Sequence, residues 1–572
     1  MPSARVPVAP SPRLLRSLAV ASALACSALV SSVLPGAVAA AEADTTVVGE
    51  LVQAWPDDEH AGTDGNHEDH GPIAWVETAA GNAVRVPAED VAGIAAGSTV
   101  ELTVGAQVKD APSAEDGLAP ARSVLAADVI DAPETAAARP DAAGLTNQVT
   151  VVLVTPGGAA RDGVTEQQIV AAVNGPVADF WTEQTGGAVR LGVTASRGWT
   201  STVAGCSNPA ALWNEVADSV GFTAGPGRHL MLYVSDAAKD CSYALAEVGA
   251  AASAGGRMYV RDSSPSVIAH EFGHNFGLGH SSGRQCDAGM EAGACRTSPY
   301  RDFYDVMGFS WGQMGALNAA QAARLGVLPL PQQQTLTAQG SGMSVTLAPL
   351  SATGGTRALR LTDADGVDYW LEYRTATGRD AWLDAPTNAY RLQTGVLLRR
   401  AGGLPNTSVL LDGTPTTAAH WDADLQAALP VGTAVSVSEG DFSVLVRSAS
   451  SAGAVVDVVP SGTPPVASPA PVTPGAVPGT VMSGAGAGAS ARAAGGPVGG
   501  AGAGPAGAAD TPVPADLPPP STGAAQPPTA TPSLVAVSET SASGWLAPAG
   551  SLLAGSALVG FFWLRRTAAR LR

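Results

Sequence analysis

Basic residues are scarce in this chain of 572 residues. Only two lysines occur, Lys109 and Lys239, and the formal net charge is −19. No basic residues cluster away from the two termini, so the chain lacks the electrostatic footprint that nucleic-acid binding requires. The acidity favours solubility and carries little information about the fold. We therefore expect no nucleic-acid partner.

Cysteine is also rare, and the first of the five, Cys26, stands in an informative place. It lies within an apolar run that follows several arginines and precedes the small-residue segment 37–41. This order of charged, apolar and small residues is typical of a secretory signal peptide, which we predict over residues 1–41. A permanent membrane anchor is the alternative, and the shortness of the run favours the signal peptide.

An exported chain would retain four cysteines, and an even number in an oxidising compartment indicates disulfides. We favour the two pairings that close local loops, Cys206–Cys241 and Cys286–Cys295. The competing interpretation is a structural zinc site made of the same four cysteines. It is disfavoured because no C-x-x-C spacing occurs.

Composition divides the chain into further segments. Runs rich in valine and threonine predict a small β-domain over 45–133. Strands alternate with helices over 146–329, which predicts a mixed α/β layer, and regularly spaced strand signals over 335–459 predict a β-sandwich. Pro, Gly, Ala, Ser and Thr dominate 460–542, a composition typical of a disordered linker. The expected fold class is therefore α+β and multidomain.

Residues 545–572 resemble a membrane anchor. The apolar stretch 545–564 is long enough to span a bilayer, and four arginines follow it, which would keep that end cytoplasmic. The ending also resembles a bacterial cell-wall sorting signal, with LAPAG at 546–550 in place of the sorting motif. Ala547 and Ala549 replace the proline and threonine usual there. We expect a protein tethered to the cell surface, through the membrane or the wall.

Two acidic stretches are candidate metal-binding sites. His60, His67 and His70 lie among acids, but no spacing there resembles a ligand pattern, so a solvated loop is favoured over a second metal site. The segment DADGVD at 363–368 resembles the start of a calcium loop and lacks the rest of that pattern. A hairpin turn is favoured, and the sequence leaves any calcium requirement open.

One stretch concentrates histidine. Residues 267–281 read VIAHEFGHNFGLGHS and contain His270, His274 and His280. Residues four apart lie on one face of a helix, so His270 and His274 can direct their rings at one ion. Gly277 can adopt the positive φ that ends the helix, and the returning chain would bring His280 to the same ion. We predict one Zn²⁺ bound by these three histidines.

Glu271, beside the first histidine, supplies the chemistry. Zinc lowers the pKa of its bound water toward about 7, and a carboxylate at this position reaches that water without binding the metal. Glu271 would take a proton during attack on a carbonyl and return it to the leaving amine. A lone H-E-x-x-H occurs by chance, but the longer spacing that includes Gly277 and His280 makes coincidence improbable.

The stretch HEFGHNFGLGH resembles the signature of the metzincin metallopeptidases. DVMG at 305–308 is similar to their methionine turn, with Met307 at the matching position, and CSYALAEVG from Cys241 resembles the gametolysin family within that group. The resemblance covers about 146–329. It implies a mixed β-sheet with an active-site helix, a methionine floor beneath the metal, and hydrolysis of extracellular proteins. The substrate would pair with an edge strand, expected near 257–260.

Two features depart from that group. Some metzincins carry a tyrosine ligand two residues after the methionine, where this chain has Phe309, and Tyr300 or Tyr304 are the candidates to lie near the cleft. The β-domain over 45–133 contains no cysteine, which excludes inhibition by a thiolate on the zinc.

The leading hypothesis is a secreted, surface-tethered zinc endopeptidase acting on proteins or peptides outside the cell. One alternative is an adhesin or ligand-binding protein whose zinc is structural. Another is that the β-domain is a propeptide, removed by processing near 137–143. Neither the substrate's identity nor the oligomeric state can be predicted from these residues.

Overall fold

The computed structural model describes residues 44–57, 71–115, 117–133, 144–416 and 424–461. The predicted signal peptide, the terminal anchor, nearly all of the linker, the acidic-loop histidines and the processing joint lie outside these residues. All described residues belong to one compact unit of the chain, Met1–Val472. Among them, no helix is long and apolar enough to cross a membrane.

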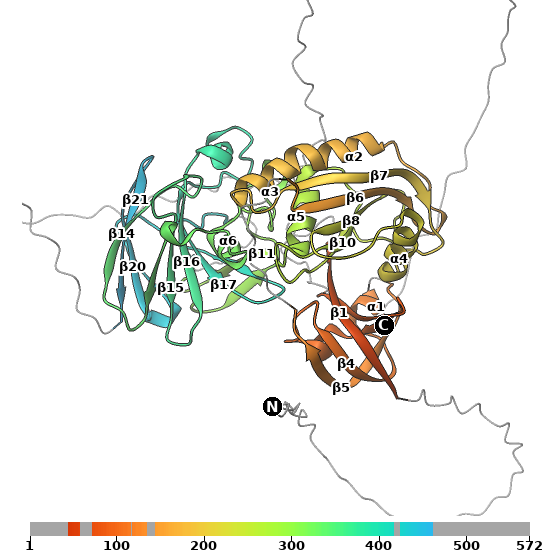
Figure 1. The fold of residues 1–572 in the computed structure, drawn as a ribbon. Helices are drawn as coiled ribbons and strands as arrows, with labels where there is room; N and C mark the ends of the chain where they lie inside the picture. The colour runs from red at the N-terminus through yellow and green to blue at the C-terminus, as the bar shows by residue number, and fades with distance from the viewer. Residues whose placement is uncertain (1–43, 58–70, 116, 134–143, 417–423, 462–572) are drawn as a thin grey trace, which may run out of the picture. The chain divides into compact units, whose positions relative to one another are not determined.

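The described chain is a strand-rich mixed α/β protein with three sheets (Figure 1). The first sheet has ten strands: β1 (Thr45–Asp57), β2 (Ile73–Thr78), β3 (Ala83–Val86), β4 (Thr99–Val108), β5 (Ala121–Asp131), β6 (Asn147–Thr155), β7 (Leu191–Ser201), β8 (Arg228–Val234), β9 (Ala244–Glu247) and β10 (Gly256–Val260). Its order is β3-β2-β1-β9-β10-β8-β6-β7, with β4 pairing β1 and β5.

The strand β1 joins two parts of this sheet. Its residues 45–50 pair with β4 and its residues 49–54 with β2, and its last four residues pair with β9. On the far side of β9, strands β10, β8, β6 and β7 run parallel to one another, and β9 is antiparallel to β10. The strands predicted as a small β-domain therefore continue, through β1, into the sheet of the segment 146–329.

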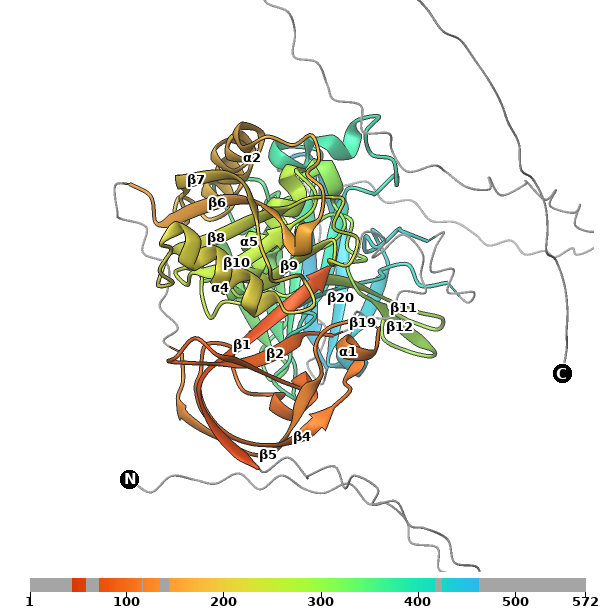
Figure 2. The ribbon, with the colours of Figure 1, turned by 90° about the vertical axis from the view of Figure 1, so that its right-hand side faces the viewer.

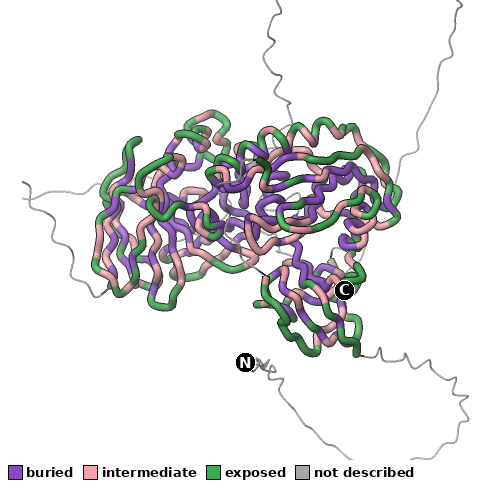
Figure 3. The backbone as a smooth tube through the Cα atoms, in the orientation of Figure 1, coloured by how far each residue is buried: buried purple, intermediate pink, exposed green. Residues whose placement is uncertain are grey.

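Helices cover this sheet and enclose its main core. Helix α2 (Glu166–Ala172) continues through a wide turn, Val173–Val177, into α3 (Ala178–Gln184). The turn contains Pro176, which lacks the N–H that an α-helix would use. Trp181 of α3 donates its indole N–H to the Ala269 carbonyl at 3.2 Å, which ties α3 to α5 (Pro265–Asn275). In Figure 3 buried backbone runs along the strands beneath these helices.

Helices α4 (Pro209–Val220) and α6 (Ala319–Arg324) are short and capped by asparagine side chains. Asn208 caps α4 by accepting from Ala211 N at 3.1 Å, and Asn318 caps α6 by accepting from Gln321 N at 2.9 Å. A third short helix, α1 (Ala111–Glu115), lies between β4 and β5. Caps of this kind satisfy backbone N–H groups that have no partner inside the helix.

Two further sheets pack face to face around a shared apolar core. The seven-stranded sheet has the order β12-β11-β18-β17-β16-β15-β13, and the four-stranded sheet has the order β14-β21-β20-β19. Their strands are β11 (Ser281–Cys286), β12 (Cys295–Ser298), β13 (Gln333–Thr337), β14 (Met343–Leu347), β15 (Ala358–Thr362), β16 (Asp368–Arg374), β17 (Gly395–Ala401), β18 (Ser408–Leu411), β19 (Ala434–Val437), β20 (Phe442–Ser450) and β21 (Gly453–Pro460). The larger sheet recruits β11 and β12 from the segment 146–329, directly after His280.

The segment 363–368 forms the turn of the β15–β16 hairpin, as the sequence predicts. Asp363 Oδ1 accepts hydrogen bonds from the backbone N–H groups of Asp365 and Val367, at 3.0 and 2.7 Å. A side chain that accepts from its own turn in this way stabilises a local reversal of the chain.

The edge strand expected near 257–260 is not an edge, and that prediction is wrong. Strand β10 lies between β8 and β9, and β9 is in turn covered by β1. The strand β9 is only four residues long, ALAE. A run that short and rich in alanine has little of the alternation and β-branching that mark a strand in sequence.

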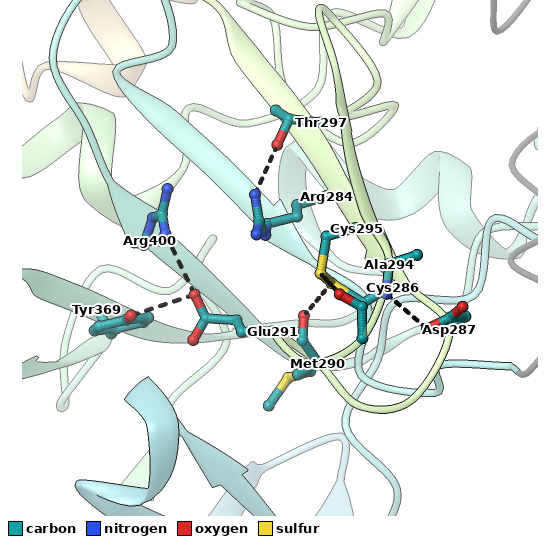
Figure 4. Close-up of a disulfide and its surroundings, with 11 residues drawn as sticks. Arg284, Cys286, Asp287, Met290, Glu291, Ala294, Cys295, Thr297, Tyr369 and Arg400 are labelled. Atoms are coloured by element: carbon teal, nitrogen blue, oxygen red, sulfur yellow. Dashed lines mark hydrogen bonds and ion pairs between the residues drawn. A yellow bond between two sulfur atoms is a disulfide. The ribbon is translucent and has the colours of Figure 1, made fainter.

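Both disulfides favoured from the sequence are present. Cys206–Cys241 ties the loop before α4 to the segment that leads into β9. Cys286 and Cys295 face each other across the β11–β12 hairpin, and Figure 4 shows Glu291, in the loop of that hairpin, beside Tyr369 and Arg400 of the same sheet. There Glu291 accepts from the Tyr369 hydroxyl at 3.3 Å and pairs with Arg400 at 3.5 Å.

A buried charge network holds the loop before α6 against β16 and β17. Arg399 pairs with Asp302, and its Nε donates to Glu372 Oε1 at 3.0 Å. Arg374 Nε donates to the same oxygen at 2.9 Å. Burial raises the pKa of Glu372, but the charges of Arg374 and Arg399 outweigh it and lower that pKa to about 2. Glu372 is therefore ionised in the folded chain.

We expect Glu372→Gln to lower the free energy of unfolding by roughly 3–5 kcal/mol, because it leaves two buried guanidinium groups undercompensated. The folded-state pKa lies below the ordinary value of 4.5, so this stabilisation is complete above about pH 4.5 and is lost as the pH falls toward 2. Denaturant unfolding of the parent chain and of Glu372→Gln between pH 7 and 3 measures this loss. The difference in their free energies of unfolding should become smaller toward pH 3. Glu101→Gln, at an exposed position of β4, is the matched control. An equal loss in both variants would contradict the account.

Candidate metal centre

The first two predicted ligands lie on α5. Pro265 occupies the first helical turn, where its missing N–H is not needed. His270 and His274 follow one turn apart, and their Nε2 atoms are 3.1 Å from each other. Both side chains are buried.

Gly277 ends the helix in the way the sequence predicts. It has a φ of 93°, and its N–H donates to the His274 carbonyl at 2.8 Å while Leu278 N donates to Gly273 O at 3.0 Å. This pair of bonds is a Schellman motif, which favours glycine at the left-handed position. A Cβ added to Gly277 would also lie 2.8 Å from the Gly249 carbonyl oxygen. The chain can therefore turn back here only with glycine.

The returning chain places His280 opposite the helix. His280 N donates to the Pro405 carbonyl at 2.7 Å, and its own carbonyl accepts from Ser408 N at 3.3 Å. His280 thus lies at the start of the larger sheet's β11, and that sheet fixes its position. Neither of its ring nitrogens has a hydrogen-bond partner among the described residues.

The hydrogen bonds of the first two rings decide which nitrogen is free. His270 Nδ1 lies 2.8 Å from the Val306 carbonyl, and His274 Nδ1 lies 2.8 Å from the Leu278 carbonyl. A carbonyl can only accept, so each Nδ1 carries the proton and each Nε2 presents a bare lone pair. Burial, followed by the charge of the neighbouring histidines, holds the pKa of His274 well below its usual range. Both rings are therefore neutral and directed at one point.

A metal ion fits this arrangement. Two buried lone pairs 3.1 Å apart repel each other unless a cation lies between them. Ligands of a tetrahedral ion with bonds of about 2.0–2.1 Å stand ~3.3 Å apart, close to the spacing found here. Imidazole nitrogens suit zinc and other first-row transition metals. The three predicted ligands are brought together as predicted.

The structure adds a fourth donor that the sequence did not indicate. Asp57, the last residue of β1, places Oδ2 3.4 Å from His270 Nε2 and Oδ1 3.4 Å from His280 Nε2. The four candidate donor atoms all lie within 4.8 Å of one another. A carboxylate oxygen is a common zinc ligand, so Asp57 is a potential fourth ligand.

Of the two tyrosines considered from the sequence, Tyr300 is at the centre. Its hydroxyl donates to Asp57 Oδ1 at 2.5 Å, and its ring lies 3.8 Å, centroid to centroid, from that of His280. Tyr300 has a φ of 58°, which is uncommon for a tyrosine and shows that its surroundings constrain it. Tyr304 instead donates its hydroxyl to the Gln393 carbonyl at 2.9 Å.

Glu271 is the unusual group of the site. It is fully buried, and its oxygens make no close hydrogen bond to a described residue, although the Asp57 carboxyl group is near enough to interact with it. Burial raises the pKa of Glu271 well above its ordinary value, and the nearby charge of Asp57 raises it further. Leaving a buried carboxylate without a close hydrogen bond costs folding free energy. Such a group needs an explanation in function.

The predicted methionine turn lies beneath the helix. Met307 is fully buried, and a Cβ added to Gly273 of α5 would lie 2.2 Å from its sulfur. The carbonyl before it, Val306 O, holds the His270 ring, and Met307 O accepts from Ser281 N at 2.7 Å. The turn therefore positions both the helix and the strand that follows His280.

Asn275, inside the histidine stretch, connects the helix to the sheet. Its Oδ1 lies 2.9 Å from His229 Nδ1 of β8, and its Nδ2 donates to the Glu247 carbonyl of β9 at 2.8 Å. It therefore ties the end of α5 to the two strands on either side of β10. No motif marks this role, because its partners lie far away in the sequence.

We expect Gly277→Ala to weaken metal binding by at least about 10-fold, because the added Cβ meets the Gly249 carbonyl and displaces the chain that carries His280. Titration with Zn²⁺ against a competing chelator measures the affinity. Gly221→Ala is the matched control, since Gly221 ends α4 at a φ of 67° with no atom within 4 Å of the added Cβ. It should lose about 1 kcal/mol of stability and keep its metal affinity. Unchanged affinity in both variants would show that the turn does not position the third ligand.

No protein-family model and no curated protein matches this chain. In the centre itself, three histidines and one aspartate are buried together and can hold a metal ion.

Proposed function

We propose that the chain is a secreted zinc endopeptidase of the metzincin type, similar to the gametolysin family, which hydrolyses peptide bonds of proteins outside the cell. The observation that carries the proposal is Glu271. Its carboxyl group is buried beside three imidazoles and Asp57, and its oxygens make no close hydrogen bond to a described residue. It suits a general base that awaits a water molecule.

The chain's own residues support this chemistry in distinct roles. A divalent ion held by the three histidines would activate water and polarise a carbonyl. Glu271 accepts the proton of that water, and its raised pKa suits it to return the proton to the leaving amine. Val306 O and Leu278 O keep His270 and His274 in the tautomer that binds metal.

The sheet offers a place for a protein substrate. Strand β9 lies next to the helix that carries the histidines, and Asn275 fixes it to the end of that helix. That edge is paired with β1 in this structure, so an extended peptide could pair with it, as peptides do with edge strands, only once β1 has left. The edge strand of the resemblance is therefore β9, in place of 257–260.

The setting outside the cell is part of the proposal. Two disulfides indicate an oxidising compartment. The proposal includes tethering of the chain through 545–572, to the membrane or to the cell wall. It also includes proteins or peptides outside the cell as the partners.

A second candidate function is a binding protein with a structural metal. It is favoured by the presence of four protein donors, because structural zinc sites are closed by four protein ligands whereas catalytic sites keep one position open. The buried Glu271, beside the three histidines, argues against it.

Glu271→Gln tests the proposal. It is made in a chain that also carries Asp57→Asn, and the Asp57→Asn single variant is the reference, so that the Asp57 carboxylate does not occupy the fourth position on the metal in either protein. We expect the double variant to hold one zinc per chain and to hydrolyse a mixed protein substrate roughly 10²–10⁴-fold more slowly than Asp57→Asn alone, because the proton acceptor is gone. Hydrolysis is followed by release of new amino termini, and zinc by elemental analysis.

Glu183→Gln, on the exposed side of α3, is the control and should leave the rate unchanged. Equal rates with and without Glu271 would sink the peptidase mechanism. Bound zinc with no hydrolysis by any of these proteins would favour the structural site.

A further inference from the structure

We propose that β1 keeps this centre latent: its last residues occupy the edge of β9, and Asp57 takes the fourth position on the metal. This inference rests on the proposed function and assigns it a means of regulation within the same chain. The inhibitory segment is 54–57. This segment and the residues it contacts belong to the same compact unit, Met1–Val472.

The backbone of the segment completes the sheet. Residues Ala54 to Asp57 pair antiparallel with Glu247 to Ala244 of β9, and Figure 2 shows β1 running along β9. The pairing is closed at both ends, because Val248 N donates to Gln53 O at 2.8 Å and Tyr243 N donates to Asp57 O at 3.0 Å. An extended substrate could not use this edge while β1 holds it.

The side chains of the segment reach the centre itself. Residues two apart on a strand point to the same face, so Trp55 and Asp57 both approach His280. The Trp55 ring lies edge-on to His280 with centroids 5.2 Å apart, and it is 1% exposed. Tyr300 holds Asp57 from the other side. The segment therefore covers the metal position with an aromatic ring and a carboxylate.

With Asp57 as a ligand, the metal has no open position, which makes the centre inactive. Four-coordinate zinc with three protein ligands keeps one position for water or substrate. With Asp57 in place, that position is taken by a carboxylate. Glu271 then lies beside Asp57, where it would otherwise meet a water on the metal. The segment thus blocks both the metal and the proton acceptor.

An ion pair beyond the centre clamps the remainder of the N-terminal strands to the sheet. Arg257 of β10 pairs with Glu77 of β2 at 2.5 Å, and also with Glu247 of β9 at 2.5 Å. Its guanidinium additionally donates to Asn214 Oδ1 at 2.7 Å. If β1 and β2 leave, Arg257 keeps Glu247 and Asn214, so release strands no buried charge. The clamp can therefore open without leaving a buried charge unpaired, while the apolar cost of release is the uncovering of Trp213, which packs against Trp75 of β2.

Cobalt(II) in place of zinc gives a test that does not depend on hydrolysis, because its visible spectrum reports the ligands. The full chain is loaded with Co²⁺ and titrated with acetohydroxamate, a small chelating anion that needs an open metal position. We expect Asp57→Asn to bind acetohydroxamate at least about 10-fold more tightly than the parent chain, since the competing carboxylate is gone. Asp128→Asn, at an exposed position of β5, is the matched control and should bind it as the parent does.

Glu77→Gln provides a second variant in case Asp57→Asn does not fold. It weakens the clamp without touching the centre, and we expect acetohydroxamate to bind severalfold more tightly than to the parent chain. Equal affinity in the parent, Glu77→Gln and any folded Asp57→Asn would overturn the proposal. So would loss of the metal from Asp57→Asn, because Asp57 would then be a required structural ligand.

Hydrolysis measured on the same proteins separates this inference from the function on which it rests. If Asp57→Asn binds acetohydroxamate tightly but cleaves nothing, the carboxylate does close the centre, and the peptidase function fails. If the parent chain cleaves protein as fast as Asp57→Asn, the function holds and latency is overturned. Slow cleavage by the parent and fast cleavage by Asp57→Asn would support both.

Discussion

Three imidazoles buried together, two of them with their Nε2 lone pairs directed at one point, are the constraint on which the structure of this centre depends. Such a cluster repels itself and buries polar atoms without partners, so it persists only where a cation compensates it. The surroundings enforce the convergence from several sides. Backbone carbonyls orient the rings of His270 and His274, and the larger sheet places His280. Beneath the helix, Met307 packs directly against Gly273.

The centre also explains why two distant parts of the chain have to fold together. His280 is held by Pro405 and Ser408, which belong to the region predicted as a β-sandwich. The loop that carries Met307 is held by the buried pairs of Arg399 and Glu372. A stable sandwich is therefore a condition for the third ligand and for the floor of the site. The segment 335–459 acts as part of the scaffold of the metal centre.

Local chemistry made the helix, its glycine end and both disulfides predictable. The i, i+4 histidines, the glycine three residues later and the loop-closing cysteine pairs each encode their geometry within a short stretch of chain. Strands such as β6 and β8 were equally clear, because continuous apolar runs mark a fully buried sheet.

Asp57, Asn275 and the β9 edge could not be predicted in the same way. Asp57 reaches the histidines across more than two hundred residues of sequence, and only the pairing of β1 with β9 brings it there. Asn275 stands inside the histidine motif, but its partners on β8 and β9 are distant. The buried arginine pairs are hidden for a similar reason, since a charged residue in a strand usually indicates an exposed face.

X-ray absorption at the zinc edge of the full chain tests the central claim most directly, because it reads the donor atoms around the metal. The proposal predicts one zinc per chain with three imidazole nitrogens and one carboxylate oxygen, at bond lengths of about 2.0–2.2 Å. Sulfur ligands, a shell of oxygens alone, or a chain that takes up no zinc would contradict the account.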